Sequence, residues 1–430
     1  MKEKQKGLEY FRSLTEWRGS RKFDLENIRP VLDRLGSPQN QIKTAQIAGT
    51  NGKGSVSAAL ASIIAMTGKR VGLNTSPHLG CVNERIIIDG YPVTDDFLGQ
   101  YSIPVKDAAD SLGINLSLFE AIMAISALGF VHSGVEFGVF EVGLGGTFDA
   151  TTTIEMPEVC AIVTIGFDHM ELLGNSLRSI ARAKAGVIRN GGTVVTGNLP
   201  QEALEEIEAV ASEKNARHIK FGRDFHYEKG PQGYVYNSNI LKKLAFKPEL
   251  AGDHQAHNMA VAITMAQVLG ASGSECSQGV ADVFWPGRLE QTYFGTRACL
   301  IDCAHNPDGF EMLCNFISRN KLGPYEVGFG VLRGRDWQGM ALKLLPHVTK
   351  WNLLLPDSDR AVPCEEIRQF LELKGAQVSV FGNNYSAYLQ EQAKSEKTEP
   401  MLVCGSMYLV GGIRSTIVPN WIPLWKAAPV

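Results

Sequence analysis

Short apolar stretches of strand length alternate with longer stretches of helical pattern along nearly the whole chain. Near the start, an apolar stretch that ends at Ala48 is followed by a helix-like stretch over 55–66. This alternation is typical of α/β layers built on mostly parallel sheets. Further strands are predicted over 69–74, 84–88, 137–141, 159–165 and 193–196, helices over 118–131 and 176–183, and a surface hairpin over 224–239.

The alternation pauses near Trp285-Pro286-Gly287-Arg288, and a second series of strands and helices then begins. Its length and pattern predict a compact Rossmann-like domain of ordinary size. No G-x-G-x-x-G string occurs in it, so a dinucleotide cofactor is not expected. The predicted strands are 298–302, 326–331, 351–355, 377–381 and 401–404, and the predicted helices include 338–345 and 365–374.

A glycine-rich turn separates the first predicted strand from the first predicted helix. It reads Gly49-Thr50-Asn51-Gly52-Lys53-Gly54-Ser55. Glycines allow backbone N–H groups and a helix N-terminus to point at an anion, and Lys53 adds a mobile positive charge. The string departs from the generic P-loop, which has Gly where Ile47 stands and Ser or Thr where Gly54 stands. We therefore predict a nucleoside triphosphate site from a particular branch of ATP-using proteins.

These patterns together predict an α/β protein of two domains. We expect an N-terminal P-loop ATPase domain with a mostly parallel sheet in residues 1–290, and a smaller Rossmann-like domain in residues 297–430. The composition fits, since 430 residues with 44% hydrophobic and 20% charged side chains suffice for two or three full cores.

Charge and composition narrow the classes of partner. A formal net charge of -3 gives no electrostatic reason to expect a nucleic acid, so small molecules are the expected partners. The first seven residues lack the apolar core of a signal peptide, and the most apolar run, 121–131, is too short to cross a bilayer. We expect a cytoplasmic protein without a membrane partner. The eight cysteines contain no C-x-x-C pair, which argues against a zinc site or a disulfide framework.

Polar side chains follow three of the predicted strands. Ser76 belongs to Thr75-Ser76-Pro77-His78-Leu79, Glu141 begins Glu141-Val142-Gly143-Leu144-Gly145-Gly146, and His169 ends Gly166-Phe167-Asp168-His169. Ligands collect at the carboxyl ends of parallel strands, so these loops should converge on the phosphates. Mg²⁺ prefers oxygen ligands such as Ser76 and Glu141, with His169 a less usual nitrogen ligand. Singly, such a glutamate more often caps or faces solvent, and such a histidine more often belongs to the core; their joint placement favours a metal site.

The ordered set of motifs resembles the folylpolyglutamate synthase and dihydrofolate synthase family, within the wider Mur ligase group. The resemblance extends from about residue 7 to residue 417 and is far more specific than any single motif. The strings that carry it are TNGKGS, TSPHL, NERI, FEA, EVGLGG, DH, KAG, GDHQAHN, WPGRLE, AHNPDG and CGSMYLVGG.

The resemblance implies an ATP-dependent amide ligase. Such an enzyme transfers the γ-phosphoryl group of ATP to a pteroate or folate carboxylate, and the amine of L-glutamate displaces phosphate from the resulting acyl phosphate. By resemblance, Lys53, His169 and Lys184 are the catalytic residues, and Ser76, Glu141 and His169 hold Mg²⁺. Lys184 matches a lysine that becomes carbamylated and holds a second metal ion; otherwise it would be taken for an exposed helix lysine.

The resemblance also implies contacts to ATP and to the other substrates. His257 and Asn258 correspond to adenine contacts, Arg288 to a phosphate contact, and Asp302 and His305 to ribose or γ-phosphate contacts, in a cleft between two domains that closes on ATP. Glu84 and Arg85 could equally form a surface ion pair. Ser406 and Arg360 are candidates for reading glutamate. The substrate-binding set that the resemblance implies is Pro77, His78, Asn83, Glu84, Arg85, Asp149 and Ser406.

Several positions depart from the family pattern. Thr147 and Thr152 replace an arginine and an asparagine, Ala183 replaces a carboxylate, Cys303 replaces a glycine, and Gly334-Arg335 stands where an Asp-Lys pair is usual. The nucleotide motifs are intact, so placement of the acceptor is affected more than ATP binding.

Three readings of function follow. The first is a glutamate ligase acting on dihydropteroate, on reduced folates or on both. The second is a Mur-type relative with another acceptor, although only 48 residues precede Gly49, which leaves no room for the substrate domain of those ligases. The third is a nucleotide-binding homologue without ligase activity. A monomer is expected.

Overall fold

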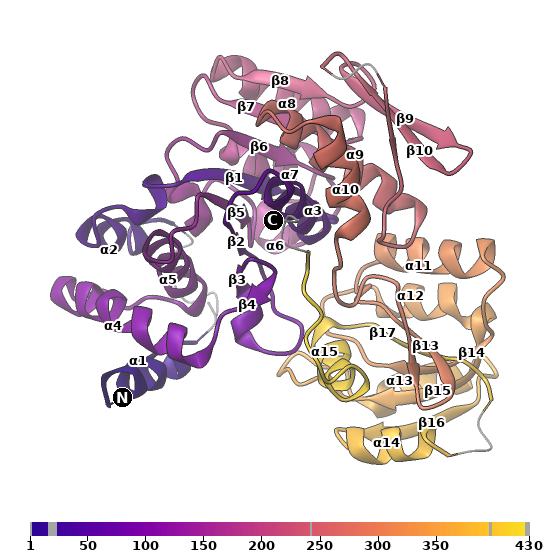
Figure 1. Cartoon of the computed structure of the whole chain (residues 1–430). Helices are drawn as coiled ribbons and strands as arrows, with labels where there is room; N and C mark the ends of the chain where they lie inside the picture. Colours follow the sequence, from indigo (N-terminus) through magenta and orange to yellow (C-terminus); the bar gives the residue numbers. More distant parts are fainter. Residues whose placement is uncertain (1, 16–23, 241–242, 395–397, 426–430) are drawn as a thin grey trace.

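The computed structural model describes residues 2–15, 24–240, 243–394 and 398–425. Two α/β units are built around separate sheets, one in the first two thirds of the chain and a smaller one in the last third (Figure 1). The predicted class, a mostly parallel α/β domain followed by a smaller α/β domain, is confirmed. The limits 1–290 and 297–430 stay predictions.

The first sheet has eight strands in the order β4-β3-β2-β5-β1-β6-β7-β8. Neighbouring strands in the series β2-β5-β1-β6-β7-β8 are parallel, while β3 pairs antiparallel with both β2 and β4. The bounds are β1 Lys43–Ala48, β2 Val71–Asn74, β3 Ile86–Ile88, β4 Tyr91–Pro92, β5 Phe137–Glu141, β6 Val159–Ile162, β7 Thr193–Thr196 and β8 Arg217–Lys220.

Helices cover both faces of this sheet because its strands carry apolar side chains on both sides. Ile47 packs into the core beneath α3, α9 and α10, and Ala48 packs into the core beneath α7 and α8 on the opposite face. The helices of this unit are α1 Lys2–Ser13, α2 Ile28–Arg34, α3 Lys53–Met66, α4 Asp95–Leu112, α5 Leu118–His132, α6 Met170–Leu173, α7 Leu177–Lys184, α8 Gln201–Glu213, α9 Asp253–Val268 and α10 Gly273–Asp282, with 3₁₀ turns η1 Pro38–Asn40, η2 Val82–Arg85, η3 Ala150–Thr153 and η4 Ala185–Val187.

The predicted hairpin is present as β9 Phe225–Gly230 and β10 Gly233–Ser238, joined by β11 Leu244–Phe246 into a three-stranded sheet. Tyr236 of this sheet is fully buried, so one face of the hairpin belongs to the core. The strand predicted over 84–88 is shorter than expected, since residues 82–85 form η2 and only Ile86–Ile88 is strand.

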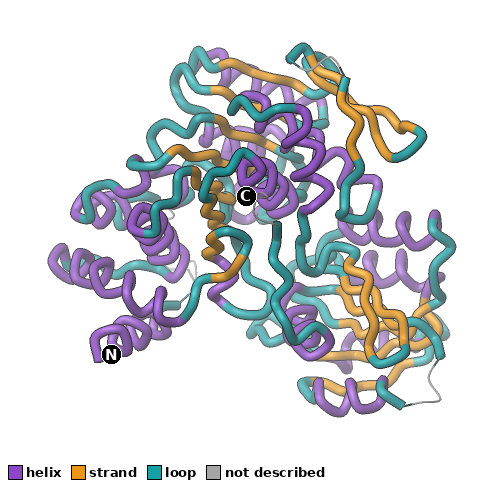
Figure 2. Tube along the Cα trace, viewed as in Figure 1, coloured by secondary structure: helices purple, strands orange, loops and turns teal. Residues whose placement is uncertain are grey.

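The second unit has a six-stranded sheet in the order β12-β13-β17-β14-β15-β16, parallel except for β12. Strands of this sheet are drawn in orange at the lower right of Figure 2. α11 to α13 pack on one face, and α14 and α15 pack on the other. Among the described residues, no helix is long and apolar enough to cross a membrane. The bounds are β12 Glu290–Phe294, β13 Arg297–Ile301, β14 Tyr325–Phe329, β15 Val348–Leu354, β16 Val378–Gly382, β17 Met401–Cys404, α11 Pro307–Arg319, α12 Trp337–Leu344, η5 Leu345–His347, α13 Cys364–Glu372, α14 Tyr385–Gln392 and α15 Met407–Ile417.

Candidate active site

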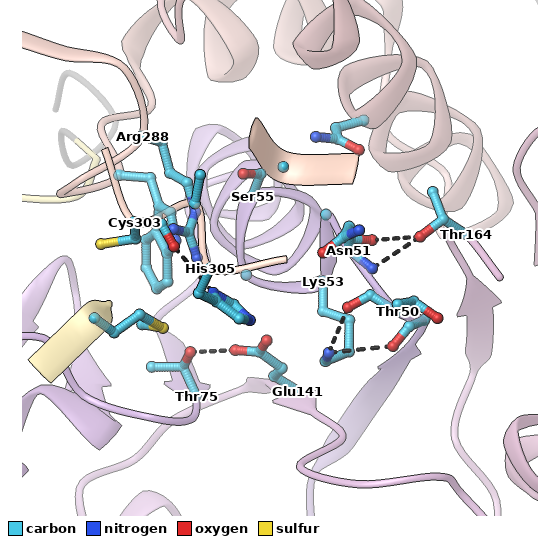
Figure 3. Close-up of a pocket in the computed structure, with 18 of the residues that line it drawn as sticks. Thr50, Asn51, Lys53, Ser55, Thr75, Glu141, Thr164, Arg288, Cys303 and His305 are labelled. Atoms are coloured by element: carbon cyan, nitrogen blue, oxygen red, sulfur yellow. Dashed lines mark hydrogen bonds between the residues drawn. The ribbon is translucent and has the colours of Figure 1, made fainter. Parts of the chain in front are cut away.

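A cavity of about 500 Å³ lies between the two units, at the carboxyl ends of β1, β2, β5 and β6 (Figure 3). Both units contribute to its wall, as expected for a cleft between domains. The predicted site residues that line it are Gly49, Thr50, Asn51, Gly52, Lys53, Gly54, Ser55, Ser76, Pro77, His78, Glu84, Glu141, His169, Lys184, His257, Asn258, Arg288, Asp302 and His305.

The glycine-rich turn is held firmly to the loop after β6. The backbone N–H of Thr50 donates to the carbonyl of Thr164 at 2.9 Å, and the N–H of Asn51 donates to the Thr164 hydroxyl at 2.9 Å. Gly52, with φ +84°, precedes α3, and a Cβ there would lie 2.5 Å from the Asn258 amide oxygen. Only glycine therefore fits the point where the turn enters the helix.

Gly54 has a separate reason to lack a side chain. A Cβ at this position would lie 2.9 Å from the indole of Trp285, which comes from the linker between the two units. In the generic P-loop, a Ser or Thr side chain stands at the position of Gly54 and would occupy the space that the Trp285 ring fills here. The departure of the motif at Gly54 is thus matched by Trp285, which packs on the first turn of α3.

Two lysines converge on one carbonyl of the turn. Lys53 Nζ donates to the Gly49 carbonyl at 3.1 Å and to the Thr50 carbonyl at 3.2 Å, and Lys184 Nζ donates to the Gly49 carbonyl at 2.9 Å (Figure 3 shows Lys53). Lys184 is buried at the end of α7. Burial, together with the charge of Lys53, lowers the pKa of Lys184 to about 7. Much of Lys184 is therefore uncharged near neutral pH.

Glu141 supplies a buried carboxylate to the cavity. It is 4% exposed, accepts a hydrogen bond from the Thr75 hydroxyl, and accepts another from the Ser76 N–H at 3.2 Å. Burial raises its pKa, which Lys53 opposes. A carboxylate and the neighbouring Ser76 hydroxyl are oxygen donors of the kind that Mg²⁺ prefers.

His169 follows β6 with φ +50° and lies on the cavity wall. Burial lowers the pKa of its imidazole, so the neutral ring that a metal requires is favoured. Within the described residues, no three His, Cys, Asp or Glu side chains converge as a metal-binding group. A cation here would therefore depend on the Ser76 hydroxyl and on phosphate or water oxygens as well.

The second unit contributes Asp302, His305 and Asn306. Asp302 accepts from the N–H groups of Leu289 at 2.9 Å and Ala304 at 2.8 Å. Burial lowers the pKa of His305 to about 4. Asn306 donates to the Asn51 side chain at 3.0 Å, which joins the second unit directly to the glycine-rich turn. Sequence reasoning missed Asn306, although the AHNPDG string contained it.

Two aromatic rings lie beside His257 at one end of the cavity. The His257 ring lies 4.8 Å from that of Phe221 and 6.2 Å from that of Tyr227, and its Nε2 accepts from the Asn198 N–H at 3.0 Å. Asn258 donates to Gln255 at 2.9 Å. Phe221, Tyr227 and Asn198 also line the cavity and were not predicted, since Asn198 follows β7, Phe221 follows β8 and Tyr227 belongs to β9, all outside the motifs.

Four predicted substrate residues lie outside the cavity wall. Arg85 is 3% exposed and donates to His78 at 3.0 Å, so it is not part of a surface ion pair with Glu84. Asn83 donates to the Val93 carbonyl at 3.0 Å. The remaining two are Asp149, which accepts from the N–H groups of Leu144 and Thr151, and Ser406, which is buried at the start of α15.

Glu84 lines the cavity, but its carboxylate accepts from the N–H groups of residues 79–81, including Leu79 at 2.8 Å. Competition between this side chain and the backbone explains why a 3₁₀ turn replaces the start of the predicted strand. Arg360 is exposed, and donates to the Arg333 carbonyl at 3.1 Å. For all these residues a role in substrate binding stays a prediction.

Two of the departures from the family pattern touch one another. Thr147 donates to the Ala183 carbonyl from its N–H at 3.0 Å and from its hydroxyl at 3.1 Å. Thr152 donates from its hydroxyl to the Gly146 carbonyl. The altered loop is therefore packed against the end of α7, next to Lys184.

Comparison with known proteins places this geometry in a family. Residues 47–266 match the model of the Mur ligase middle domain. The chain is 32% identical to the folylpolyglutamate synthase of Lacticaseibacillus casei over 412 residues, which cover 92% of this chain and 94% of the relative. It is 31% identical to the dihydrofolate synthase/folylpolyglutamate synthase of Bacillus subtilis over 411 residues, which cover 91% and 94%.

Solved structures give the same result. The apo form of L. casei FPGS superimposes with a TM-score of 0.84 at 31% identity, covering 96% of this chain and 99% of that one. E. coli FolC in complex with DHPP and ADP superimposes with a TM-score of 0.85 at 25% identity, covering 96% and 97%. The chain belongs to the folylpolyglutamate synthase and dihydrofolate synthase family of Mur-type ligases.

Proposed function

We propose that this chain joins L-glutamate to dihydropteroate, to reduced folates or to both, in an ATP-dependent ligase reaction. The observation that carries the proposal is the single cavity in which the glycine-rich turn, Lys53, Glu141, His169 and Lys184 meet residues of the second unit. The relatives that cover nearly the whole chain are enzymes with these names. ATP is the expected nucleotide, since solved relatives were crystallised with ADP and AMPPCP.

The chemistry requires an activated carboxylate, because a carboxylate ion is a poor electrophile. Transfer of the γ-phosphoryl group to the acceptor carboxylate forms a C–O–P bond and releases ADP. The amine of L-glutamate then attacks the carbonyl carbon, and phosphate leaves with the C–O bond electrons. Closure of the two units around the reactants excludes water, which protects the acyl phosphate from hydrolysis.

Lys53 and the backbone N–H groups of the turn would bind the phosphates, and His257 with Asn258 would contact adenine. Arg288 would reach the phosphates from the linker. Asp302 and His305 would contact ribose or γ-phosphate from the second unit. These are positioning and electrostatic roles, which dominate catalysis of phosphoryl transfer.

Ser76, Glu141 and His169 would hold Mg²⁺ through the hydroxyl, carboxylate and neutral imidazole described above. After carbamylation, Lys184 would hold a second Mg²⁺. Carbamylation requires the uncharged form of the amine. The product is a carbamate, whose oxygen atoms can bind a metal ion that an ammonium group would repel. Bound Mg²⁺ neutralises charge on the transferring phosphoryl group. The buried carboxylate of Glu141 and the lowered pKa of Lys184 both fit these roles.

The two other readings have weaker support. A Mur-type relative with a different acceptor would not be expected to match folate ligases over more than nine tenths of its length. An inactive homologue would not be expected to keep Lys53, Glu141, His169 and Lys184 on one cavity. We also propose that the protein is a monomer, that it lies in the cytoplasm, and that its two domains are residues 1–290 and 297–430.

Isotope transfer tests both the activity and its intermediate. Tetrahydrofolate or dihydropteroate carrying ¹⁸O in the reacting carboxylate is incubated with ATP, Mg²⁺ and L-glutamate, and the released phosphate is analysed by mass spectrometry. One ¹⁸O per phosphate is expected, because the acyl phosphate leaves an acceptor oxygen on phosphorus. Glutamate-dependent release of unlabelled phosphate would contradict the acyl phosphate.

A further inference from the structure

Arg288 lies in a tight turn between the two units, formed by residues 287–290 and called here the Arg288 turn. Gly287 and Leu289, the residues on either side of Arg288, have φ angles of +67° and +47°. A left-handed backbone is unfavourable for a residue with a side chain, and Leu289 is also buried. Such a conformation persists only where surrounding contacts hold it. The contacts around the Arg288 turn therefore decide where Arg288 points.

Two buried carboxylates hold the Arg288 turn by its backbone. The Gly287 N–H donates to a carboxylate oxygen of Glu290 at 2.8 Å. The Leu289 N–H donates to Asp302 at 2.9 Å. The guanidinium of Arg288 makes one long contact, 3.5 Å to the Gly287 carbonyl, and it lines the cavity. Neighbouring residues thus shape the turn, while the guanidinium is left to face the cavity.

The charge of Arg288 reaches the phosphate end of the cavity. Burial raises the pKa of Glu141, and the charges of Lys53 and Arg288 both oppose this rise. Lys53 belongs to the glycine-rich turn, and Glu141 lies on the cavity wall. Arg288 therefore acts on the same part of the cavity as Lys53, although it comes from the linker between the two units.

Glu290 is itself fixed by Arg414 of α15. Arg414 Nε donates at 2.7 Å to the oxygen that also accepts from Gly287, and Arg414 Nη2 donates at 2.8 Å to the other oxygen. Both side chains of this ion pair are buried. A guanidinium that binds both oxygens fixes the orientation of the carboxylate. Glu290 therefore connects α15 to the backbone beside Arg288.

We propose that Glu290, oriented by Arg414, is a positioning residue that presents the Arg288 guanidinium to the phosphates of ATP. This inference rests on the proposed function. A change at Glu290 that weakens its bond to the Gly287 N–H loosens the Arg288 turn, so its effect on the site is exerted through Arg288. An ion pair that only stabilised the second unit would act independently of Arg288.

A double-mutant cycle between Glu290→Gln and Arg288→Ala tests this coupling. Glu290→Gln removes the negative charge and one acceptor oxygen with little change in size. The kcat/KM for ATP and, by calorimetry, the affinity for AMPPCP are measured in the wild type, the two single variants and the double variant. Glu326→Gln is the matched control, because Glu326 forms a buried ion pair with Arg297 at the opposite end of β13 from the Arg288 turn. Thermal melting shows whether each variant is folded.

Glu290→Gln is expected to weaken AMPPCP binding and to lower kcat/KM for ATP about 10- to 100-fold, but to change kcat/KM less than about twofold once Arg288 is alanine. Arg414→Lys keeps the charge but not the two-pronged contact, and should show a smaller loss that also disappears without Arg288. It provides the same cycle should Glu290→Gln fail to fold. Glu326→Gln should lower the melting temperature while kcat/KM stays within about twofold of the wild type.

Equal fold losses from Glu290→Gln with and without Arg288 would overturn the positioning role, as would an unchanged kcat/KM in the single variant. A wild type that ligates neither acceptor would instead refute the proposed function. In that case the cycle measured on AMPPCP binding still tests Glu290, and additive losses in affinity would overturn its role.

Discussion

Arg335 of the second unit forms an ion pair with Asp168 of the first, and Asp168 lines the cavity. The two side chains are 17% and 12% exposed, so water screens the pair only partly. Burial alone would raise the pKa of Asp168, but the charge of Arg335 opposes this and the pKa is lowered. Arg335 stands beside Gly334 at one of the departures from the family pattern, and keeps a positive charge there. The pair links the two units directly at the edge of the site.

Arg335→Ala should weaken the closed arrangement of the two units. We expect kcat/KM for ATP to fall about tenfold, since loss of one partner leaves a partly buried charge unpaired. Arg333→Ala is the matched control, because its pair with Glu366 is far more exposed and contributes little. The rate of ADP release gives kcat/KM for ATP in both variants. Equal values of kcat/KM in Arg335→Ala and Arg333→Ala would contradict a role for the pair with Asp168 in closure.

Glu141→Gln tests the proposed Mg²⁺ site. The amide oxygen can still accept from the Ser76 N–H, so the fold should persist, but the negative charge is lost. We expect kcat to fall about 100-fold or more and the Mg²⁺ concentration for half-maximal rate to rise. The measurement is initial rate against Mg²⁺ concentration, with the exposed Glu158→Gln as a control. An unchanged Mg²⁺ dependence in Glu141→Gln would remove this residue from the metal site.

Lys184 should react with carbon dioxide. Its pKa of about 7 leaves much of the amine uncharged near neutral pH, which is the form that attacks CO₂. Protein incubated with ¹³C-bicarbonate should show a carbamate resonance by ¹³C NMR, and Lys184→Arg should lack it. Lys184→Gln should have an activity at least about 100-fold lower, because the negative charge of the carbamate is lost from the site. A resonance that persists in Lys184→Arg would place the carbamate elsewhere.

Gly54→Ala should strain the contact with Trp285. A Cβ 2.9 Å from the indole requires that ring or the helix to shift, and we expect a loss of about 1–3 kcal/mol in the free energy of unfolding. Trp285→Leu provides the background for a double-mutant cycle measured by chemical denaturation. In that background Gly54→Ala should cost much less. An equal cost in both backgrounds would show that Trp285 is not the reason for glycine at this position.

Local sequence signals predicted much of this fold and site. The strand, turn and helix around Lys53 were predictable because glycines and helix pattern act over a few residues. Glu84 was harder, since its hydrogen bonds to nearby backbone N–H groups override the apolar pattern that follows it. Arg85 was expected in the substrate-binding set, with a surface ion pair to Glu84 as the alternative, but it is buried against His78, a contact that depends on how the loop folds back.

The features of the fold and the site that could not be predicted depend on contacts between residues far apart in the sequence. Asp168 and Arg335 are separated by 167 positions, and Trp421 meets Gly90 across 331 positions. No periodicity or spacing in the sequence specifies such pairs. The resemblance to a family supplied the order of the motifs, but it did not indicate that Thr147 and Ala183, two departures from its pattern, would be in contact through hydrogen bonds from Thr147 to the Ala183 carbonyl.

Product analysis tests the central claim most directly. Purified protein is incubated with ATP, Mg²⁺ and L-glutamate, with either dihydropteroate or tetrahydrofolate as acceptor, and the products are identified by mass spectrometry. Dihydrofolate from the first acceptor, glutamyl-extended folate from the second, or both, is the predicted result. Neither product from a protein that still binds ATP would contradict the account, and would show that the altered loop at Thr147 has changed the acceptor or ended ligation.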